Sequence, residues 1–333
     1  MTEKPLVSII TPVLNLVKNK RVESFKNCLE SVHQQTYANI EHIVVDGAST
    51  DGTIDILKKY TQNGYIQYIS QKDSCLYEAM NTGIDISQGK YIAILNSDDF
   101  FHNCQAVELS VDALEKSNAD FSYADCDITR DGKFLWLFKG NRERFISAMP
   151  FSHQTMFTKR QVMLDFNKFN LKYRMAADYD FIIRIMLGGC TSVYIPKSIS
   201  TFCLGGISES SYDKTKEDCA NIFIEHYSHF YTFSSWEEAY YLFDNKNVNL
   251  NFIKSFYKMA KYNKFTNFDW KITTFILLSF CHIGVLRFYG RIYLAIRKKR
   301  LKSAIRMELI RNFLRWAASL QKHENIEANR NKN

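Results

Sequence analysis

The sequence lacks the paired cysteines that mark disulfide-rich and zinc-binding proteins. None of its eight cysteines forms a CxxC pair, and several lie in apolar or helix-like stretches. This pattern indicates reduced thiols in a cytoplasmic protein rather than a disulfide framework or a zinc site. The first residues, MTEKPLVSII, place no long apolar stretch after a positive charge, so we expect no signal peptide.

Three motifs of well-known enzyme classes are also missing. No GxGxxG follows the first strand-like run, which argues against a dinucleotide-binding oxidoreductase. No GxxxxGK[ST] is present, so the chain is not a P-loop protein. No GxSxG elbow is present either, which argues against an α/β-hydrolase.

Charge is unevenly spread along the chain. The net charge is +8, but residues 254–333 hold 18 Lys and Arg against 4 Asp and Glu, so this segment carries +14 and residues 1–253 carry −6. An acidic body with a basic tail predicts that the tail meets an anionic partner: a membrane surface, a nucleic acid or phosphates. A solvated helix face is the simpler alternative.

The C-terminal segment, 206–333, has a helical and amphipathic pattern. Its charge-free stretch at 272–286 is fifteen residues long, whereas a helix that spans a bilayer needs roughly 20. Arg287, Arg291 and RKKR at 297–300 follow this stretch. Helices with apolar bulk and a cationic face lie in the membrane interface, so we expect binding to an anionic membrane surface and no nucleic-acid partner. A helical pair packed on the body, or a true span, are the alternatives.

Strand-like and helix-like patterns alternate through the first half of the chain. Apolar, β-branched runs predict strands, and apolar residues at helical spacing predict the intervening helices. The predicted strands lie at 7–13, 40–46, 66–70, 91–95 and 119–128, and the clearest helices at 21–34, 74–87, 104–117 and 176–189. Strands apolar along their whole length predict an α/β fold: a mostly parallel sheet with helices on both faces.

Polar residues follow the ends of the predicted strands. Asn15, Asp46, Asp51 and the pair Asp98–Asp99 all lie just beyond apolar runs. In parallel sheets ligands bind beyond the carboxyl ends of the strands, so we expect these side chains to gather at one edge. Two adjacent carboxylates suit a divalent cation such as Mg²⁺ or Mn²⁺, although SDD could also cap the next helix.

Two other groups of residues could take part in chemistry. Asp46 could accept a hydrogen bond from a nucleobase or a ribose, or it could shape a turn. In AADYDF, either Asp178 or Asp180 could act as a general base, or the two could cap a helix. His153 could contact a phosphate or an acceptor, although a lone histidine is more often structural.

Five stretches appear in a characteristic order. They are VSIITPVLN (7–15), IVVDGASTDGT (43–53), LYEAMNTGI (76–84), GKYIAILNSDD (89–99) and AADYDF (176–181). Together they resemble the inverting family 2 glycosyltransferases of the GT-A fold, above all bacterial enzymes that build O-antigen, capsule or exopolysaccharide. The resemblance covers about residues 5–205 and implies a catalytic domain at 1–205 followed by a helical, basic region at 206–333.

The resemblance implies roles for the nucleotide-binding residues. Thr11 and Pro12 would border the nucleotide, and Asp46 would contact a uracil-type base. Asp98 would bind the ribose or the metal. Asp99 would bind the Mn²⁺ or Mg²⁺ that bridges the diphosphate of a nucleotide-sugar donor.

The resemblance also implies a base and reveals departures from the family pattern. Asp178 would be the base that activates the acceptor hydroxyl, with inversion following from one in-line attack. Asn96 stands where such enzymes usually have an acid, and Cys75 stands where a glycine is common. Ala177 replaces the acid that often precedes the base, which leaves Asp178 and Asp180 open as alternatives.

The expected function follows from these residues. We expect an inverting, metal-dependent glycosyltransferase that moves a sugar, from a UDP-sugar, to a hydroxyl of a growing, lipid-linked glycan. It would be peripheral on the cytoplasmic face of the inner membrane, held there by its basic C-terminal helices. The alternatives are transfer to a polyprenyl phosphate, and, in a different class, an inactive sugar-nucleotide-binding protein or a basic adaptor.

Overall fold

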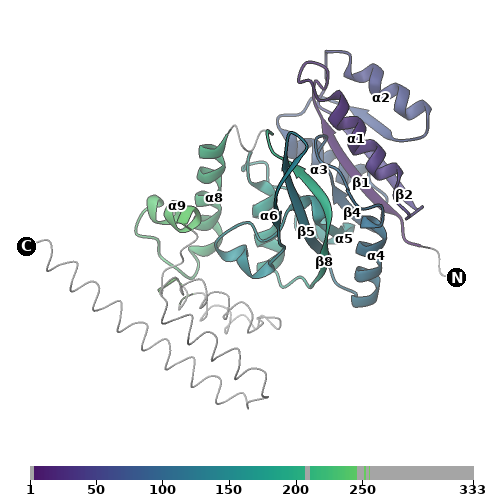
Figure 1. The fold of residues 1–333 in the computed structure, drawn as a ribbon. Coiled ribbons are helices and arrows are strands. Elements are labelled where there is room, and N and C mark those ends of the chain that lie inside the picture. The colour runs from purple at the N-terminus through teal and green to yellow at the C-terminus, as the bar shows by residue number, and fades with distance from the viewer. Residues whose placement is uncertain (1–3, 207–210, 246–250, 253–254, 256–333) are drawn as a thin grey trace, which may run out of the picture.

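One mixed sheet of eight strands, covered by helices, forms the body of the molecule (Figure 1). The computed structural model describes residues 4–206, 211–245, 251–252 and 255. The strands are β1 (Val7–Val13), β2 (Ile40–Asp46), β3 (Gln67–Ser70), β4 (Tyr91–Ile94), β5 (Phe121–Arg130), β6 (Lys133–Phe138), β7 (Phe157–Lys159) and β8 (Ser192–Cys203). The helices are α1 (Val22–His33), α2 (Thr53–Gln62), α3 (Leu76–Ile86), α4 (Ala106–Ser117), α5 (Arg160–Asp165), α6 (Ala177–Leu187), α8 (Tyr212–Tyr227) and α9 (Trp236–Asn245).

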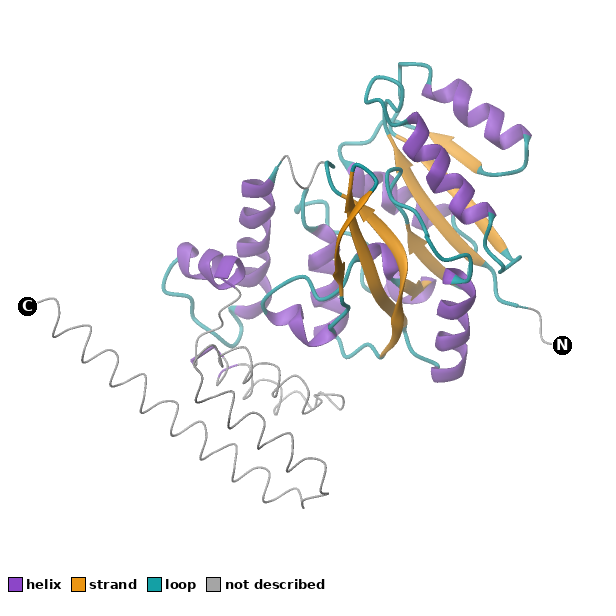
Figure 2. Cartoon of the chain, viewed as in Figure 1, coloured by secondary structure: helices purple, strands orange, loops and turns teal. Residues whose placement is uncertain are grey.

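Half of the sheet is parallel and confirms the predicted α/β architecture. Strands β3, β2, β1 and β4 lie side by side in this order, and each pairs with its neighbour in parallel. The connections run through helices, as Figure 2 shows. Because all four strands point the same way, the residues that follow β1, β2 and β4 meet at one edge of the sheet.

The other half of the sheet is mixed. Strand β7 is antiparallel to both β4 and β5 and joins the two halves. Strand β8 is parallel to β5, and β6 is antiparallel to it. A hairpin turn joins β5 and β6, where Asp131 and Gly132 both have positive φ, of 50° and 72°. Two consecutive positive φ values suit the right-handed twist of a tight hairpin.

Alternate residues of β1 face opposite helical layers. Ile10 packs in a buried cluster with residues of α3, whereas Ile9 packs in another with residues of α1 and α4. Thr11 continues the row of Ile9, and its hydroxyl lies 3.8 Å from the thiol of Cys28 in α1. Pro12 belongs to the opposite row. The alternation of a strand therefore decides which of two neighbouring residues faces which layer.

A glycine lets α3 approach the sheet closely. A Cβ atom on Gly83 would lie 2.4 Å from Cγ2 of Ile10 in β1. Any other residue at 83 would push the helix away from the strand or force Ile10 to move. The close packing fixes the start of α3, and with it Tyr77, relative to the carboxyl edge of the sheet.

Two described helices follow the sheet and pack beside α6 (Figure 1). The ring of Tyr179 in α6 lies 6.1 Å from that of Phe223 in α8, and the Tyr227 hydroxyl of α8 donates to the carbonyl of Phe145 at 3.2 Å. The region after 205 is therefore helical as far as it is described. The expected boundary at 205/206 stays a prediction, and the apolar and basic patterns at 272–300 lie outside the described residues.

Candidate active site

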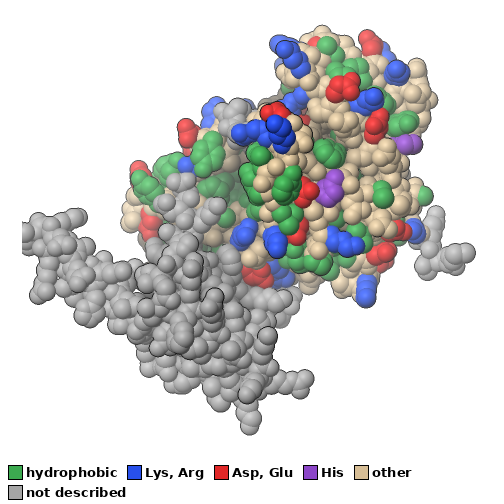
Figure 3. Space-filling view, viewed as in Figure 1, with side chains coloured by type: hydrophobic (Ala, Val, Ile, Leu, Met, Phe, Trp, Pro, Cys, Tyr) green, Lys and Arg blue, Asp and Glu red, His purple; other side chains and the backbone are tan. Residues whose placement is uncertain are grey.

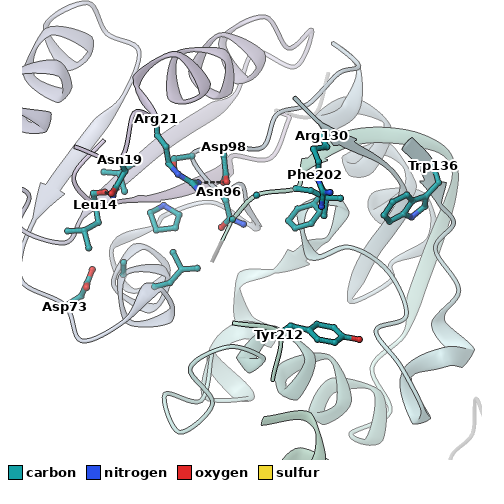
Figure 4. A pocket seen from close by; sticks show the side chains of 18 residues that line it. Leu14, Asn19, Arg21, Asp73, Asn96, Asp98, Arg130, Trp136, Phe202 and Tyr212 are labelled. Carbon is teal, nitrogen blue, oxygen red and sulfur yellow. Dashed lines mark hydrogen bonds and ion pairs between the residues drawn. The ribbon is translucent and has the colours of Figure 1, made fainter. Parts of the chain in front are cut away.

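A cavity of about 820 Å³ opens at the carboxyl edge of the sheet (Figure 4). Its walls come from the segments that follow β1 and β4 and from the mixed half of the sheet. The lining residues are Pro12, Val13, Leu14, Asn19, Arg21, Asp73, Leu76, Ala79, Asn96, Ser97, Asp98, Arg130, Trp136, Phe202, Leu204, Gly205, Gly206 and Tyr212. One wall is rich in charged and amide side chains, and the opposite wall carries aromatic rings.

Asp98 lines the cavity and pairs with a cation. Its Oδ2 atom accepts a hydrogen bond from Nη1 of Arg21, the residue that precedes α1. The two side chains are 20% and 29% exposed. The pair joins the end of β4 to the start of α1 while both groups remain open to the cavity (Figure 4).

Asp99 is fully buried, and both of its carboxylate oxygens accept hydrogen bonds from the protein. Its Oδ1 accepts from the backbone N–H of Cys203 at 2.9 Å, and its Oδ2 accepts from Nε2 of Gln154 at 2.8 Å and Nδ2 of Asn96 at 3.1 Å. Burial, and then the charge of the neighbouring Asp98, raise the pKa of Asp99 well above its usual value. The two adjacent carboxylates therefore lie in different environments. Asp98 faces the cavity, whereas Asp99 is buried and hydrogen-bonded to three segments of the chain.

The oxygen atoms at this edge fit a hard divalent cation. Among the described residues, Oδ1 of Asn96 is buried without a hydrogen-bond partner, and Asn96 lines the cavity beside Asp98. Because its Nδ2 donates to Asp99, the amide oxygen is the free end of this side chain. An amide oxygen and a carboxylate are the ligand types that Mg²⁺ and Mn²⁺ take.

Asp178 lies in the first turn of α6 and is held by two donors. It accepts from the hydroxyl of Tyr77 at 2.8 Å, and its Oδ2 lies 3.1 Å from Nδ1 of His153. Burial alone would raise the pKa of Asp178, but the hydrogen bonds of His153 and Tyr77 and the charge of His153 hold it below its ordinary value. The carboxylate is therefore ionised at neutral pH.

His153 connects this carboxylate to the end of β4. Its Nδ1 contacts Asp178, and its Nε2 lies 3.5 Å from Nδ2 of Asn96. One ring thus contacts both Asn96, after β4, and Asp178, at the start of α6. Contact with Asp178 is a feature that the sequence did not predict for this histidine.

Asp180, the other acid of AADYDF, is buried and fully paired. Its Oδ2 accepts from Nε of Arg184 at 2.8 Å, and its Oδ1 lies 2.7 Å from Nε2 of His226 in α8. Glu225 also lies close enough to share a cation with Asp180 and His226. However, Glu225 is already bonded to Lys172 and to the hydroxyl of Tyr173. The cluster ties α8 to α6.

Two of the residues expected at the nucleotide do not line the cavity. The hydroxyl of Thr11 lies 3.0 Å from Nε2 of buried His42 and faces α1. Asp46 is fully buried and accepts from the N–H of Ser49 at 2.9 Å and the hydroxyl of Ser70 at 2.6 Å. Asp46 therefore shapes the loop after β2.

The remaining residues expected at the strand ends do meet. Asn15 donates its N–H to Ser49 at 2.7 Å and accepts from the N–H of Thr50 at 3.1 Å. Asp51 accepts from the N–H of Lys18 at 2.6 Å and so joins the same loops. Pro12 and Asp98 both line the cavity. The expected gathering at one edge is confirmed.

Several site residues carry no motif that the sequence reasoning could use. Arg21 stands alone before a helix, and Gln154 and Trp136 lie far along the chain from the strand ends that they face. The signal that could have found Arg21 is its position. It is a cation directly before the first helix, at the same sheet edge as two carboxylates.

The chain is similar in sequence to known glycosyltransferases. The family model described as Glycosyl transferase family 2 matches residues 8–180. Over 215 residues the chain is 30% identical to the PGL/p-HBAD biosynthesis glycosyltransferase of Mycobacterium bovis, a match that covers 63% of this chain and 82% of the relative.

Two solved structures are similar in fold. One is Staphylococcus aureus TarS 1–349 in complex with UDP-GlcNAc, with a TM-score of 0.55 and 15% identity over 82% of this chain and 79% of that one. The other is the mannosyltransferase PcManGT from Pyrobaculum calidifontis in complex with GDP-Man and Mn²⁺, with a TM-score of 0.53 and 15% identity over 87% of this chain and 84% of that one. They confirm the expected GT-A-like fold.

Proposed function

The chain belongs to glycosyl transferase family 2 and is a glycosyltransferase with a nucleotide-sugar donor, and we propose that this donor is a UDP-sugar. The observation that carries the proposal is the cavity edge where Asp98, Asn96 and Arg21 meet. This edge offers the oxygen atoms of Asp98 and Asn96 to a metal ion and the guanidinium of Arg21 to phosphate oxygens. A diphosphate with its metal requires both kinds of group. The UDP-GlcNAc complex of TarS supports a UDP-sugar, and the GDP-Man complex of PcManGT keeps a GDP-sugar as the alternative.

We assign the metal-binding role first to Asp98. Its carboxylate and the free amide oxygen of Asn96 would hold Mn²⁺ or Mg²⁺. Asp99, which the sequence suggested as a ligand, has both oxygens occupied by protein donors and would act by holding Asn96 in place. When bound, the cation supplies Lewis-acid stabilisation of the departing nucleoside diphosphate.

Arg21 supplies a second positive charge for the same group. In the described structure the guanidinium neutralises Asp98. A donor diphosphate in the cavity would offer the guanidinium more oxygen atoms, and arginine binds phosphate through two parallel N–H donors. We therefore propose that Arg21 contacts the diphosphate and stabilises the charge that develops on it as the sugar leaves.

Asp178 is the proposed general base. It is ionised, accessible over part of its surface (15%) and oriented by His153 and Tyr77. A carboxylate held in this way can accept the proton of an acceptor hydroxyl as the oxygen attacks the anomeric carbon. Attack on the side opposite to the leaving diphosphate inverts the configuration. Asp180 is not available for this step because Arg184 and His226 occupy its two oxygens.

The loop after β2 is proposed to recognise the nucleobase. Asp46 fixes Ser49 and Ser70, and Thr11, whose hydroxyl contacts His42, does not line the cavity. These residues would act by shaping the wall near Pro12 and Asp73, which line the cavity. Direct contact of Asp46 with a uracil-type base requires a rotation of its side chain away from these serines.

The acceptor is proposed to be a lipid-linked glycan. The +14 charge of residues 254–333 supports binding to the anionic cytoplasmic face of the inner membrane. Within the described residues no helix is both long and apolar enough to cross a bilayer. Transfer to a polyprenyl phosphate is the competing reaction, and incubation with labelled donor and each acceptor class separates the two.

Calorimetric titration of UDP, with and without Mn²⁺, tests the proposal. We expect Mn²⁺ to strengthen UDP binding by about tenfold or more in the wild type and to have little effect in Asp98→Asn, which weakens the ligand but keeps its shape. Asp55→Asn is the matched control, because that carboxylate is 82% exposed on α2.

Two outcomes contradict parts of the proposal. If the affinity for UDP is the same with and without Mn²⁺ and in Asp98→Asn, then Asp98 does not bind the metal. Absence of UDP binding under every condition would remove the UDP-sugar, and GDP and dTDP would be titrated next. Failure of all three nucleotides would favour the basic-adaptor alternative.

A further inference from the structure

Strand β6 exposes four consecutive large apolar side chains. Phe134, Leu135, Trp136 and Leu137 are 58%, 44%, 50% and 38% exposed. Successive residues of a strand point to opposite faces, so the hairpin of β5 and β6 is uncovered on both of its faces at β6. Figure 3 shows hydrophobic side chains gathered over this hairpin, with Lys and Arg side chains at its tip.

An exposed apolar strand of this kind is expected to contact another molecule or segment. Strand β6 pairs only with β5 within the described residues, so its outer edge also presents unpaired backbone groups. Long, flat and apolar edges lead to aggregation unless something covers them. Runs of exposed apolar residues are retained where they serve binding.

Cations frame the apolar residues. Lys133 and Lys139 are exposed at the two ends of β6, and the guanidinium of Arg144 lies 5.7 Å from the ring of Phe138. The segment 130–144 holds five Lys and Arg and two Asp and Glu, which gives a net charge of +3. Aromatic and aliphatic side chains with lysines around them are the composition of surfaces that enter the headgroup region of an anionic bilayer.

The positive charge of the hairpin favours one of the possible partners over the others. Residues 254–333 carry +14, so electrostatic repulsion disfavours this segment as the cover of a hairpin with a charge of +3. A second copy of the hairpin would bring the same positive charge. An anionic lipid surface is complementary to both the charge and the apolar side chains, and each Lys or Arg near such a surface contributes to binding.

We propose that the β5–β6 hairpin inserts its apolar residues into the headgroup region of an anionic membrane. The catalytic domain would then touch the bilayer directly, in addition to any contact made by residues 254–333. Trp136 belongs to the same strand and also lines the cavity that holds Asp98. The mouth of the cavity would thus lie at the membrane surface. This position would bring a lipid-linked acceptor to the cavity, and in that respect the inference rests on the proposed function.

Hydrogen exchange of the full chain localises the contact. The probes are vesicles of equal parts phosphatidylglycerol and phosphatidylcholine, with pure phosphatidylcholine vesicles for comparison. We expect the amides of residues 131–139 to exchange about tenfold more slowly with the anionic vesicles. The amides of α2, on the far side of the domain, should be unchanged.

A pair of substitutions tests the energetics. Phe134→Ser with Leu135→Ser should weaken partitioning into the anionic vesicles by about tenfold, because two large apolar side chains no longer leave water. The matched control is Ile86→Ser with Leu171→Ser, which removes two side chains of similar exposure (45% and 39%) elsewhere on the surface. The control should bind as the wild type does.

Three results would overturn the proposal. The first is binding to vesicles without slower exchange at 131–139, which assigns the contact elsewhere. The second is slower exchange that rises with protein concentration in the absence of vesicles, which assigns the strand to a second copy of the chain. The third is no vesicle binding at all. Each of these results is independent of the UDP titration. A negative vesicle experiment leaves the proposed sugar transfer unaffected, and a negative UDP titration leaves the proposed membrane contact unaffected.

Discussion

Two regions of the molecule each carry a pair of acids, and each pair is divided in the same way. After β4, Asp98 lines the cavity while Asp99 is buried beneath three donors. At the start of α6, Asp178 remains partly accessible while Asp180 is buried against Arg184 and His226. In both regions one carboxylate is bonded to distant parts of the fold, and its neighbour stays partly accessible.

The difference between the two regions lies in what faces the available acid. Asp98 faces a permanent cation, Arg21, which neutralises its charge in the described structure. Asp178 faces an imidazole and a phenol, whose hydrogen bonds orient the carboxylate and keep it ionised, as a base requires. The same residue type thus suits ligand binding in one region and proton transfer in the other.

The largest effect is expected at the available acid of the second region. Asp178→Asn keeps the shape of the side chain but removes the base, so kcat for sugar transfer should fall by about 10² to 10⁴. Measured donor binding should stay within about twofold of the wild type, since Asp178 does not line the cavity around Asp98. Unchanged kcat would reassign the base.

The buried acid of the same region should respond through stability. In Asp180→Asn the partners Arg184 and His226 lose a fully buried carboxylate, and removal of one member of such a pair costs about 3–5 kcal/mol of the free energy of unfolding. Urea denaturation of both variants measures the contrast. Equal stability of Asp178→Asn and Asp180→Asn would contradict the division described here.

The cation of the first region should affect donor affinity. Arg21→Gln leaves Asp98 without its partner and removes a diphosphate contact, so we expect UDP to bind about 10 to 100 times more weakly. Lys26→Gln is the matched control, because Lys26 is an exposed cation on α1, the helix that follows Arg21. If the two variants bind UDP equally well, Arg21 has no role at the diphosphate.

The smallest effect concerns the packing behind the first region. Burial lowers the pKa of His42 to about 3, from an ordinary value near 6.5. The ring is therefore neutral in the folded protein but takes up a proton on unfolding between about pH 6.5 and 3, so acid favours the unfolded state. We expect the free energy of unfolding to fall by about 1.4 kcal/mol per pH unit in this window because of His42.

A variant isolates this pH dependence. His42→Gln should show a shallower fall in the free energy of unfolding between pH 6.5 and 5, measured by urea titration at each pH. His33→Gln removes a histidine that stays exposed, stacked on Tyr65, and should keep the wild-type slope. Identical slopes in all three proteins would mean that His42 is not neutral in the fold.

The sequence predicted the parallel half of the sheet because its signal is local. Strands β1, β2 and β4 carry apolar runs, β3 (QYIS) is short and half polar, and helix-like spacing fills the gaps between the strands. The order of the mixed half could not be predicted in the same way. The antiparallel place of β7 between β4 and β5 depends on pairings such as Ala93 with Phe157, which join residues far apart in the chain.

The site was predicted in outline and missed in its details for the same reason. The strand ends identified Asp98 and Asp99 as neighbours at the ligand edge, but no local pattern says which of two adjacent acids will be buried. Gln154 and the backbone of residue 203 decide this, from elements formed much later in the sequence. Arg21 was missed because a single cation before a helix has no distinctive pattern.

The three donors to Asp99 also have a consequence for how the protein is made. Its partners are Asn96 beside it, Gln154, which is 55 residues away, and Cys203, which is 104 residues away. Contacts of such high sequence separation form late, after long loops have closed. A nascent chain on the ribosome therefore carries the NSDD motif long before it carries all three donors to Asp99, which are complete only once residue 203 has left the exit tunnel.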